Sequence, residues 1–285
     1  MIMRAAWSSA QRRDLYVLPF VLLLAGFVVV ALLAPWIAPR DPNAQFLMGR
    51  LKPPGTALRG VAYWLGTDEI GRDLMSRVIW GARISLLVAS VSVTISMTIG
   101  TALGMIAGFR RGWVEIVIMR AVDIVLSIPA LLLAIITVAV VGPGLWTLVL
   151  VLGFTRWPRY ARVAYGQTLA VTNMPFVRAS RAYGTGAVRI LWRHVLPNIS
   201  GAVIVVATLE FGLMVLSEAG LSFLGLGVVP PTPSWGGIMS TGRNYLTSAW
   251  WIATFPGLCL FLLILSVNMI GDWLRDRFDP RTAKE

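Results

Sequence analysis

The sequence contains one cysteine, Cys259, and one histidine, His194. A single cysteine excludes a disulfide scaffold within the chain, and a single histidine leaves almost no basis for a histidine-built metal site. Charged residues are scarce, at 13% of the chain, whereas ordinary globular proteins carry about 25%. No Gly-x-x-x-x-Gly-Lys-Ser/Thr phosphate-binding loop occurs, so the chain does not bind ATP by that device.

Hydrophobic residues make up 57% of the 285 residues, and the mean hydropathy is +0.75. This composition predicts an all-α integral membrane protein rather than a soluble or disordered chain. The net charge of +12 is compatible with nucleic-acid binding. In a membrane chain, however, basic residues gather on the cytoplasmic flanks of the spans, so we predict membrane lipid as the surroundings and no nucleic-acid partner.

Six apolar stretches are candidates for transmembrane helices, because a bilayer core of about 30 Å takes about 20 apolar residues in helix. The fourth stretch is the weakest, since its apolar part, Leu145–Thr155, is short and is followed by Arg156, Arg159 and Arg162. We expect these arginines at the membrane interface beside aromatic side chains. The predicted spans are 16–37, 84–107, 114–141, 145–165, 199–226 and 250–270.

The basic residues favour six spans with the N- and C-termini in the cytoplasm. In that topology sixteen of the 25 Lys and Arg residues lie inside and eight lie outside, as the positive-inside rule requires. A five-span topology would separate the basic stretch 156–193 from Arg12 and Arg13, so we reject it. The first apolar run is too long for the core of a signal peptide and is taken as an uncleaved span.

These spans divide the chain into three parts. Residues 1–83 contain the first span and an external loop with an amphipathic segment, and residues 84–275 form a core of five spans. Residues 276–285 form a cytoplasmic tail. A cytoplasmic loop at 166–198 separates the fourth and fifth spans.

Small residues recur every four positions along the second span, at Ser92, Ser96, Gly100, Gly104 and Gly108. Such a stripe lets another helix backbone approach closely. We favour packing within the chain over a dimer interface.

Charged residues also fall within the predicted spans, where they usually face the bundle interior or a water-filled cavity. Arg120 and Asp123 are three positions apart and are expected to pair along one helix face. Glu210 and Glu218 are two turns apart and are expected to share a face. Two interpretations stay open for these four residues: they line a translocation path, or they make polar contacts between helices.

The loop 166–198 predicts a helix–turn–helix knob. Pro175 suits the first turn of a helix over 176–183, and Gly184-Thr185-Gly186 ends it. A second short helix over 187–194 presents Val188, Leu191 and Trp192 on one stripe and Arg189 and Arg193 on another. We expect Leu196-Pro197-Asn198 to end this helix, with Asn198 capping the next span. His194 then lies at a helix C-terminus, where dipole compensation or loop packing explains it better than catalysis. The apolar stripe fits a groove on a soluble partner, although a helix lying on lipid is the alternative.

The spacing of Gly184, Ile190, His194 and Leu196-Pro197-Asn198 resembles the coupling loop of ABC importer permeases. That loop usually opens with Glu-Ala-Ala, and this chain has Arg178-Ala179-Ser180 there. The resemblance implies that the loop docks on an ATPase. The residues expected to dock are Arg178, Ala179, Ser180, Gly184, Ile190, Trp192, His194, Leu196, Pro197 and Asn198.

Three further stretches, 65–86, 221–236 and 271–281, resemble the C-type permease subunit of dipeptide, oligopeptide and nickel importers. In physical terms, Thr67 is expected to cap a helix and Asp73 to pair with Arg77. Residues 230–233 suit a stiff extended segment, and Trp235 suits a membrane interface.

The resemblance implies the type I, MetI-like permease fold and a bacterial cytoplasmic (inner) membrane. It also implies a second permease subunit, two ATPase subunits that bind ATP and Mg, and an extracytoplasmic solute-binding protein. The chain itself is then expected to be no enzyme and to hold no metal or cofactor. Di- or oligopeptide is the expected cargo, with nickel, glutathione or another small solute as alternatives.

Two rival functions stay open at this point. A proton-coupled secondary transporter would use Glu210, Glu218 or Asp123. A membrane scaffold or receptor would transport nothing and would need no ATPase.

Overall fold

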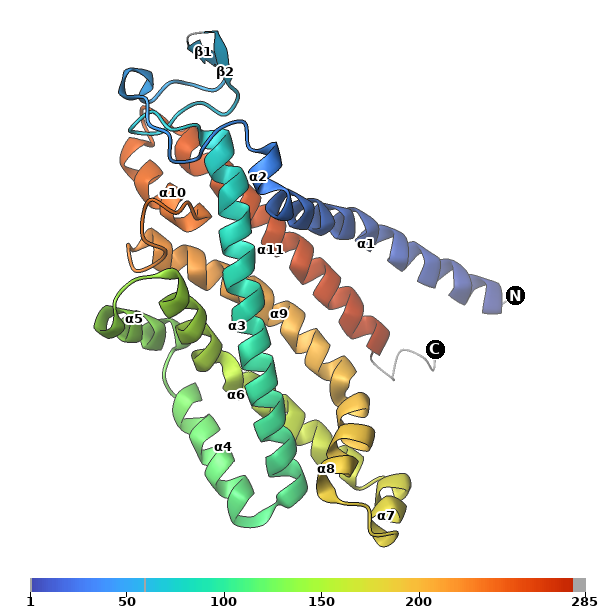
Figure 1. Cartoon of the computed structure of the whole chain (residues 1–285). Helices are drawn as coiled ribbons and strands as arrows, with labels where there is room; N and C mark the ends of the chain where they lie inside the picture. The colour runs from blue at the N-terminus through green and yellow to red at the C-terminus, as the bar shows by residue number, and fades with distance from the viewer. Residues whose placement is uncertain (1, 59, 279–285) are drawn as a thin grey trace.

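A computed structural model describes residues 2–58 and 60–278 of the chain (Figure 1). It is a bundle of long helices with one small hairpin. The first elements are α1 (Ile2–Leu32), α2 (Ala34–Ile37), η1 (Leu47–Gly49), β1 (Thr56–Leu58), β2 (Val61–Tyr63) and α3 (Leu74–Arg110). The next are α4 (Gly112–Leu126), α5 (Ala130–Val141), α6 (Leu145–Thr172), α7 (Pro175–Ala182), α8 (Ala187–Ile190) and η2 (Leu191–Val195). The last are α9 (Leu196–Phe223), α10 (Trp235–Gly242), η3 (Arg243–Tyr245) and α11 (Trp251–Phe278).

The two ends of the bundle differ. The β1–β2 hairpin lies at one end, which we call the hairpin end, and α7 lies at the opposite end, which we call the α7 end (Figure 1). Of the predicted tail 276–285, the first three residues belong to α11 and residues 279–285 lie outside the described part of the chain.

Within the described residues, four helical segments are long and apolar enough to cross a membrane: Leu15–Leu32, Leu74–Arg110, Ala187–Phe223 and Trp251–Phe278. The bent pair of α4 and α5 makes a fifth if it counts as one span. Helix α6 coincides with the fourth predicted span, but it carries the arginines that lower its apolarity. The count of six therefore stays a prediction.

The predicted single helix over 114–141 is wrong, because the chain bends by 84° between α4 and α5. Pro129 precedes α5 with extended backbone angles. Proline lacks an N–H and disfavours helical angles in the residue before it. The two halves of this segment therefore point in different directions (Figure 1).

The predicted helix end at residues 196–198 is also wrong. Helical structure runs without a break from Ala187 to Phe223, and the amide of Leu196 donates to the Leu191 carbonyl across a π-helical turn. A π turn lets a helix pass a position where the regular hydrogen bond is missing, and Pro197 supplies no N–H. Asn198 does not cap α9, because its side-chain amide donates to the His194 carbonyl at 2.7 Å.

The predicted packing of the small-residue stripe within the chain is confirmed. Ser92 donates to the Val149 carbonyl at 3.0 Å, and Ser96 donates to the Gly153 carbonyl at 2.8 Å. A Cβ atom at Gly108 would lie 2.9 Å from Cβ of Thr168. Serine donors and bare glycines thus let α3 and α6 pack backbone to backbone.

At the hairpin end, α3 is capped by a different residue from the one predicted. Asp73 accepts hydrogen bonds from the amide and the hydroxyl of Ser76, at 2.9 and 2.6 Å. Thr67 instead links loops, by accepting from the amide of Lys52 and donating to the Gly49 carbonyl. The predicted side-chain pair of Asp73 with Arg77 is therefore not formed.

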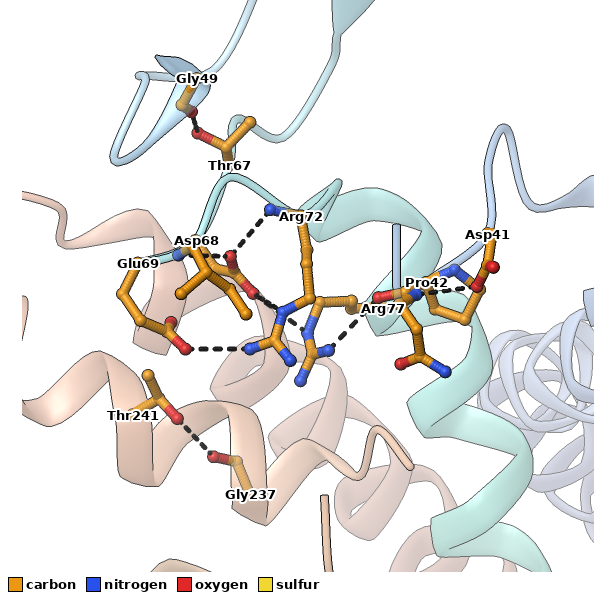
Figure 2. Close-up of polar contacts among 12 residues, drawn as sticks. Asp41, Pro42, Gly49, Thr67, Asp68, Glu69, Arg72, Arg77, Gly237 and Thr241 are labelled. Carbon is orange, nitrogen blue, oxygen red and sulfur yellow. Dashed lines mark hydrogen bonds and ion pairs between the residues drawn. The ribbon is translucent and has the colours of Figure 1, made fainter. Parts of the chain in front are cut away.

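The guanidinium groups of Arg72 and Arg77 share the buried carboxylate of Asp68 (Figure 2). The Arg72 Nε–Asp68 Oδ2 distance is 2.6 Å, and the Arg77 Nε–Asp68 Oδ2 distance is 3.4 Å. Arg72 also binds Glu69 at 2.9 Å. Arg77 thus pairs with Asp68, while the Asp73 side chain is used in capping α3.

Trp235 was predicted at a membrane interface, but it is fully buried and donates its indole N–H to the Val78 carbonyl at 2.9 Å. Trp251 likewise donates to the Thr67 carbonyl at 3.1 Å. Each indole inserts its ring into the core and pairs its one polar atom, which is the usual condition for burying tryptophan. These two contacts attach α10 to the start of α3 and α11 to the loop before it.

Candidate functional site

The helix–turn–helix knob is present at the α7 end. Helix α6 extends beyond the predicted span to Thr172, and α7 begins at Pro175, as predicted. We define the knob as residues 173–195, which comprise α7, a glycine turn, α8 and the π turn η2 (Figure 1). Because η2 continues into α9, the second half of the knob and the long helix are one rod.

The inner face of the knob is apolar and buried. Val177, Ile190 and Val195 are each no more than 1% exposed. They form one hydrophobic cluster with Met105 of α3 and Tyr160 of α6. Burial of such side chains contributes about 1.5–3 kcal/mol each, so the knob is fixed to the bundle.

The outer face of the knob is apolar and exposed. Tyr183, Val188 and Trp192 are 89%, 70% and 67% exposed. Trp192 and Val188 line a shallow hollow together with Gly186, Ala187 and Arg189. Large apolar side chains next to a basic residue, held by a rigid scaffold, are typical of a surface that binds another protein.

The turn of the knob requires glycine. Gly184 has φ +76°, and its amide donates to the Arg181 carbonyl at 2.9 Å. The amide of Thr185 donates to the Ser180 carbonyl at 3.1 Å. These bonds satisfy the last carbonyls of α7, and glycine adopts this left-handed conformation without the clash of a Cβ.

His194 was predicted at a helix C-terminus, but the helix continues through it into α9. Its ring lies edge-on to Phe176, with centroids 5.9 Å apart, and Nε2 is 3.5 Å from the Ser180 hydroxyl. The predicted alternative of loop packing therefore describes His194. Through these contacts it ties α7 to η2.

The ten predicted docking residues do not all lie on the surface. Six of them are exposed: Arg178, Ala179, Gly184, Trp192, Pro197 and Asn198. Ser180, His194 and Leu196 are half-buried, and Ile190 is buried. Sequence reasoning missed Tyr183 as an exposed contact residue. Its position directly before Gly184, at the tip of the turn, was the signal for it.

The arginines of α6 bind carboxylates of neighbouring helices. Buried Arg156 binds Glu210 of α9 at 3.3 Å and Ser217 at 2.8 Å. Half-exposed Arg159 binds the same carboxylate at 2.7 Å. Glu210 lies 14 residues after the start of α9, and Arg159 lies 14 residues after the start of α6. Buried Arg156 requires such partners, because an unpaired charge inside the bundle is strongly destabilising.

The predicted Arg120–Asp123 pair is not formed. Asp123 of α4 instead makes an ion pair with Arg162 of α6, and both side chains are about half exposed. One turn after Arg162 on α6, the hydroxyl of Tyr165 donates to Glu115 of α4. Arg120 lines a hollow of about 640 Å³ beside these residues. Asp123 thus pairs with an arginine on another helix rather than with Arg120, three positions before it on its own helix.

Glu210 and Glu218, which are expected to share a face of α9, bind different neighbouring helices. Glu218 is completely buried and accepts hydrogen bonds from Ser85 of α3 at 2.9 Å and from Ser222 at 2.8 Å. It therefore joins α9 to α3, whereas Glu210 joins α9 to α6. For Glu218 the interpretation as a contact between helices holds.

One face of α6 remains open between its neighbours. It carries Arg159 and Arg162, each bound to a carboxylate of a flanking helix and each at least half exposed. A second hollow, of about 600 Å³, adjoins Arg159 and is also lined by Asn268 and Asp272 of α11. Exposed charges at the middle of a long apolar bundle face water or another protein rather than lipid.

These features describe a bundle of long apolar helices with an exposed apolar knob at one end. Residues 100–284 match the family described as binding-protein-dependent transport system inner membrane component, and the chain belongs to this family. It is thus a membrane permease of an ABC transporter and is not the ATPase.

Several curated proteins are similar along most of their length. The chain is 46% identical to a di/tripeptide transport system permease protein of Pseudomonas aeruginosa, over 92% of this chain and 86% of that protein. It is 44% identical to a dipeptide transport system permease protein of Escherichia coli, over 88% and 84%. It is 38% identical to a glutathione transport system permease protein of Pectobacterium atrosepticum, over 92% and 85%.

Solved structures share the fold. A chain of the MetNI methionine ABC transporter in an inward-facing conformation aligns with a TM-score of 0.58 at 22% identity. The alignment covers 72% of this chain and 98% of the other. The MetI-like fold that the sequence motifs imply is therefore confirmed.

Proposed function

We propose that this chain is one of two permease subunits of an ATP-driven importer for di- or oligopeptides. Membership of the permease family and the names of the similar proteins support this proposal. Six spans with both termini in the cytoplasm belong to it, as do a second permease subunit and an extracytoplasmic solute-binding protein. Two ATPase subunits would bind ATP and Mg, because this chain has no phosphate-binding loop of its own.

The observation that carries the coupling mechanism is the continuity of the knob with α9. Residues 187–223 form one helical rod, and α7 is held to this rod by Phe176, Ser180 and His194. A partner that grips the outer face of the knob would therefore move α9 as a rigid body. Packed interfaces of this kind switch between discrete arrangements rather than deforming gradually.

In this mechanism ATP closes the ATPase subunits around the knobs and opens the path outward, and hydrolysis reverses the change. Shifting an equilibrium from 1:99 to 99:1 requires a difference in binding free energy of about 5.5 kcal/mol. The exposed apolar side chains of the knob offer contact area for such a difference. The open face of α6, with its two half-exposed arginines, would line the passage.

The docking role is tested by Trp192→Glu in the assembled transporter. We expect the variant chain to insert and to pair with the second permease, but to lose the ATPase subunits and peptide uptake. Trp64→Glu is the matched control, because Trp64, directly after β2, is 66% exposed and Trp192, in η2 of the knob, is 67% exposed. Normal ATPase retention and uptake in Trp192→Glu would refute the docking role.

Glutathione stays the second candidate cargo, since one similar protein bears that name. Uptake of labelled dipeptide by reconstituted transporter, challenged with excess glutathione or nickel, separates these cargoes. The same preparation distinguishes the proton-coupled alternative. An ATP-driven importer stops without ATP and continues with an uncoupler, whereas a proton-coupled transporter does the reverse.

A further inference from the structure

The hollow between α6, α9 and α11 carries charges of both signs. Its polar lining consists of Arg159, Glu210, Asn268 and Asp272. Its walls are Val163, Val206, Leu209 and Leu213, which are neutral and apolar. A few polar groups set among apolar walls, in a volume of about 600 Å³, is the usual composition of a small-ligand site.

Two of the four polar groups are available to a ligand. Arg159 uses Nη1 to bind Glu210, and its other N–H donors have no partner among the described residues. Asp272 is exposed and has no ion-pair partner in that part of the chain. The hollow therefore offers guanidinium donors for an anion and a carboxylate for a cation.

The packing of α9 against α11 holds this lining in place. The amide of Asn268 lies over Gly212, where an added Cβ would be 3.0 Å from it. One turn further, a Cβ at Gly271 would be 2.8 Å from the Thr208 hydroxyl oxygen. Asp272 follows Gly271 directly, so this close approach of the two helices fixes its backbone beside the hollow.

Arg159 and Glu210 lie within two of the predicted spans, 145–165 and 199–226. A half-exposed arginine inside a span is costly if it faces lipid. Arg159 is 50% exposed there. The hollow is therefore a hydrated part of the molecule rather than a lipid-facing groove.

We propose that this hollow binds the two charged ends of a zwitterionic peptide in transit, an inference that rests on the proposed function. The guanidinium of Arg159 binds the carboxylate of the peptide, and the carboxylate of Asp272 binds its α-ammonium group. Charge-assisted hydrogen bonds of this type are the strong ones. The apolar walls offer no hydrogen bonds to peptide side chains. Recognition therefore depends on the two charged ends, and the site accepts peptides of many sequences.

The test measures binding of dialanine to the transporter complex in nanodiscs, without the solute-binding protein, by equilibrium dialysis. The ligands are dialanine, its N-acetyl derivative and its C-terminal amide. For the wild type we expect N-acetylation to weaken binding about tenfold, which corresponds to about 1.4 kcal/mol. In Asp272→Asn, free dialanine should lose the same factor and N-acetylation should cost nothing further. The amide should lose the same factor in both proteins, because its change lies at the other end of the ligand.

Asp41→Asn is the matched control, since Asp41 is an exposed aspartate remote from the hollow, before η1. It should bind all three ligands as the wild type does. Equal losses upon N-acetylation in the wild type and in Asp272→Asn would overturn the site while leaving peptide import intact. A wild-type complex that neither binds nor imports dialanine would overturn the peptide cargo and the site together.

Discussion

Gly104 of α3 lies so close to Ala164 of α6 that a Cβ atom on the glycine would be 2.8 Å from Cβ of the alanine. Gly100 has the same relationship with Tyr160, at 2.6 Å. The two long helices are therefore in contact along their backbones over several turns. The position of α6, and with it the position of its arginines, depends on this contact.

Gly104→Ala should lower the stability of the bundle by about 1–3 kcal/mol, the usual cost of overpacking a filled interface. Thermal unfolding of the detergent-solubilised protein measures it. Gly166→Ala is the control on the opposing helix, because a Cβ there meets nothing within 4 Å. Alanine should leave the stability unchanged or raise it by up to about 1 kcal/mol. Equal behaviour of the two variants would show that α3 and α6 are less tightly packed than described.

Gly184→Ala should strain the turn of the knob by about 1–2 kcal/mol, because φ +76° is unfavourable for any residue with a Cβ. We expect faster hydrogen exchange in residues 175–195 and weaker coupling of ATP hydrolysis to uptake. Gly186→Ala should do neither, since Gly186 has φ −62° and open space around it. Unchanged exchange in Gly184→Ala would contradict the role of the turn.

Much of the fold follows from local patterns in the sequence. Apolar length predicted the long helices, and the glycine turn with Pro175 predicted the knob, because both are set by neighbours along the chain. The four-residue spacing of Ser92 to Gly108 predicted close packing within the chain. The bend at Pro129 and the π turn before Pro197 were misjudged, since a proline can break a helix or be absorbed by it, and surrounding contacts decide which.

The pairing of the charged residues could not be predicted from the sequence. Spacing suggested Arg120 with Asp123 and Asp73 with Arg77, yet the bonds run from Arg162 to Asp123 and from Arg77 to Asp68. The Arg159–Glu210 bond joins residues 51 positions apart. Charge partners on different helices depend on how the helices are rotated and packed, and no local period encodes that. For the same reason Asn268 and Asp272 were missed.

Trp192→Ala and Trp235→Ala should separate function from stability. Trp235 is fully buried and donates to the Val78 carbonyl, so its removal should cost about 3–5 kcal/mol and reduce the amount of folded protein. Trp192 is exposed, and its removal should leave the melting temperature unchanged but weaken ATPase binding. Melting curves and co-purification of the ATPase measure the two effects. A stability loss in Trp192→Ala comparable to that in Trp235→Ala would contradict the described surface.

Glu210→Gln and Asp123→Asn remove the same charge from two different settings. Glu210 is 3% exposed and holds buried Arg156, so its loss leaves a buried cation without its partner and should cost about 3–5 kcal/mol. Asp123 and Arg162 are 52% and 57% exposed, so Asp123→Asn should cost about 1 kcal/mol or less if water reaches the pair. Unfolding in nanodiscs measures both. A large loss for Asp123→Asn would mean that the open face of α6 is dry.

Glu69 lies in the loop before α3, and burial, reinforced by the nearby charge of Asp68, raises its pKa above the usual 4.5. One of its carboxylate oxygens, Oε2, is buried without a hydrogen-bond partner. A raised pKa in the folded state means that the ionised form destabilises the fold, so stability should fall as pH rises from 4.5 through the folded pKa. Glutamine keeps an acceptor for Arg72 and removes the charge.

Glu69→Gln should therefore be more stable than the wild type at neutral pH, by about 1 kcal/mol, because the neutral amide avoids burying a negative charge beside Asp68. Below pH 4.5 the two proteins should melt alike, because the wild-type carboxyl is then protonated. Melting temperatures from about pH 4 to about pH 8 measure the difference. The Asp41→Asn variant should show no such trend, since Asp41 is exposed. A Glu69→Gln protein that is less stable at neutral pH would mean that attraction to Arg72 outweighs the cost of burial.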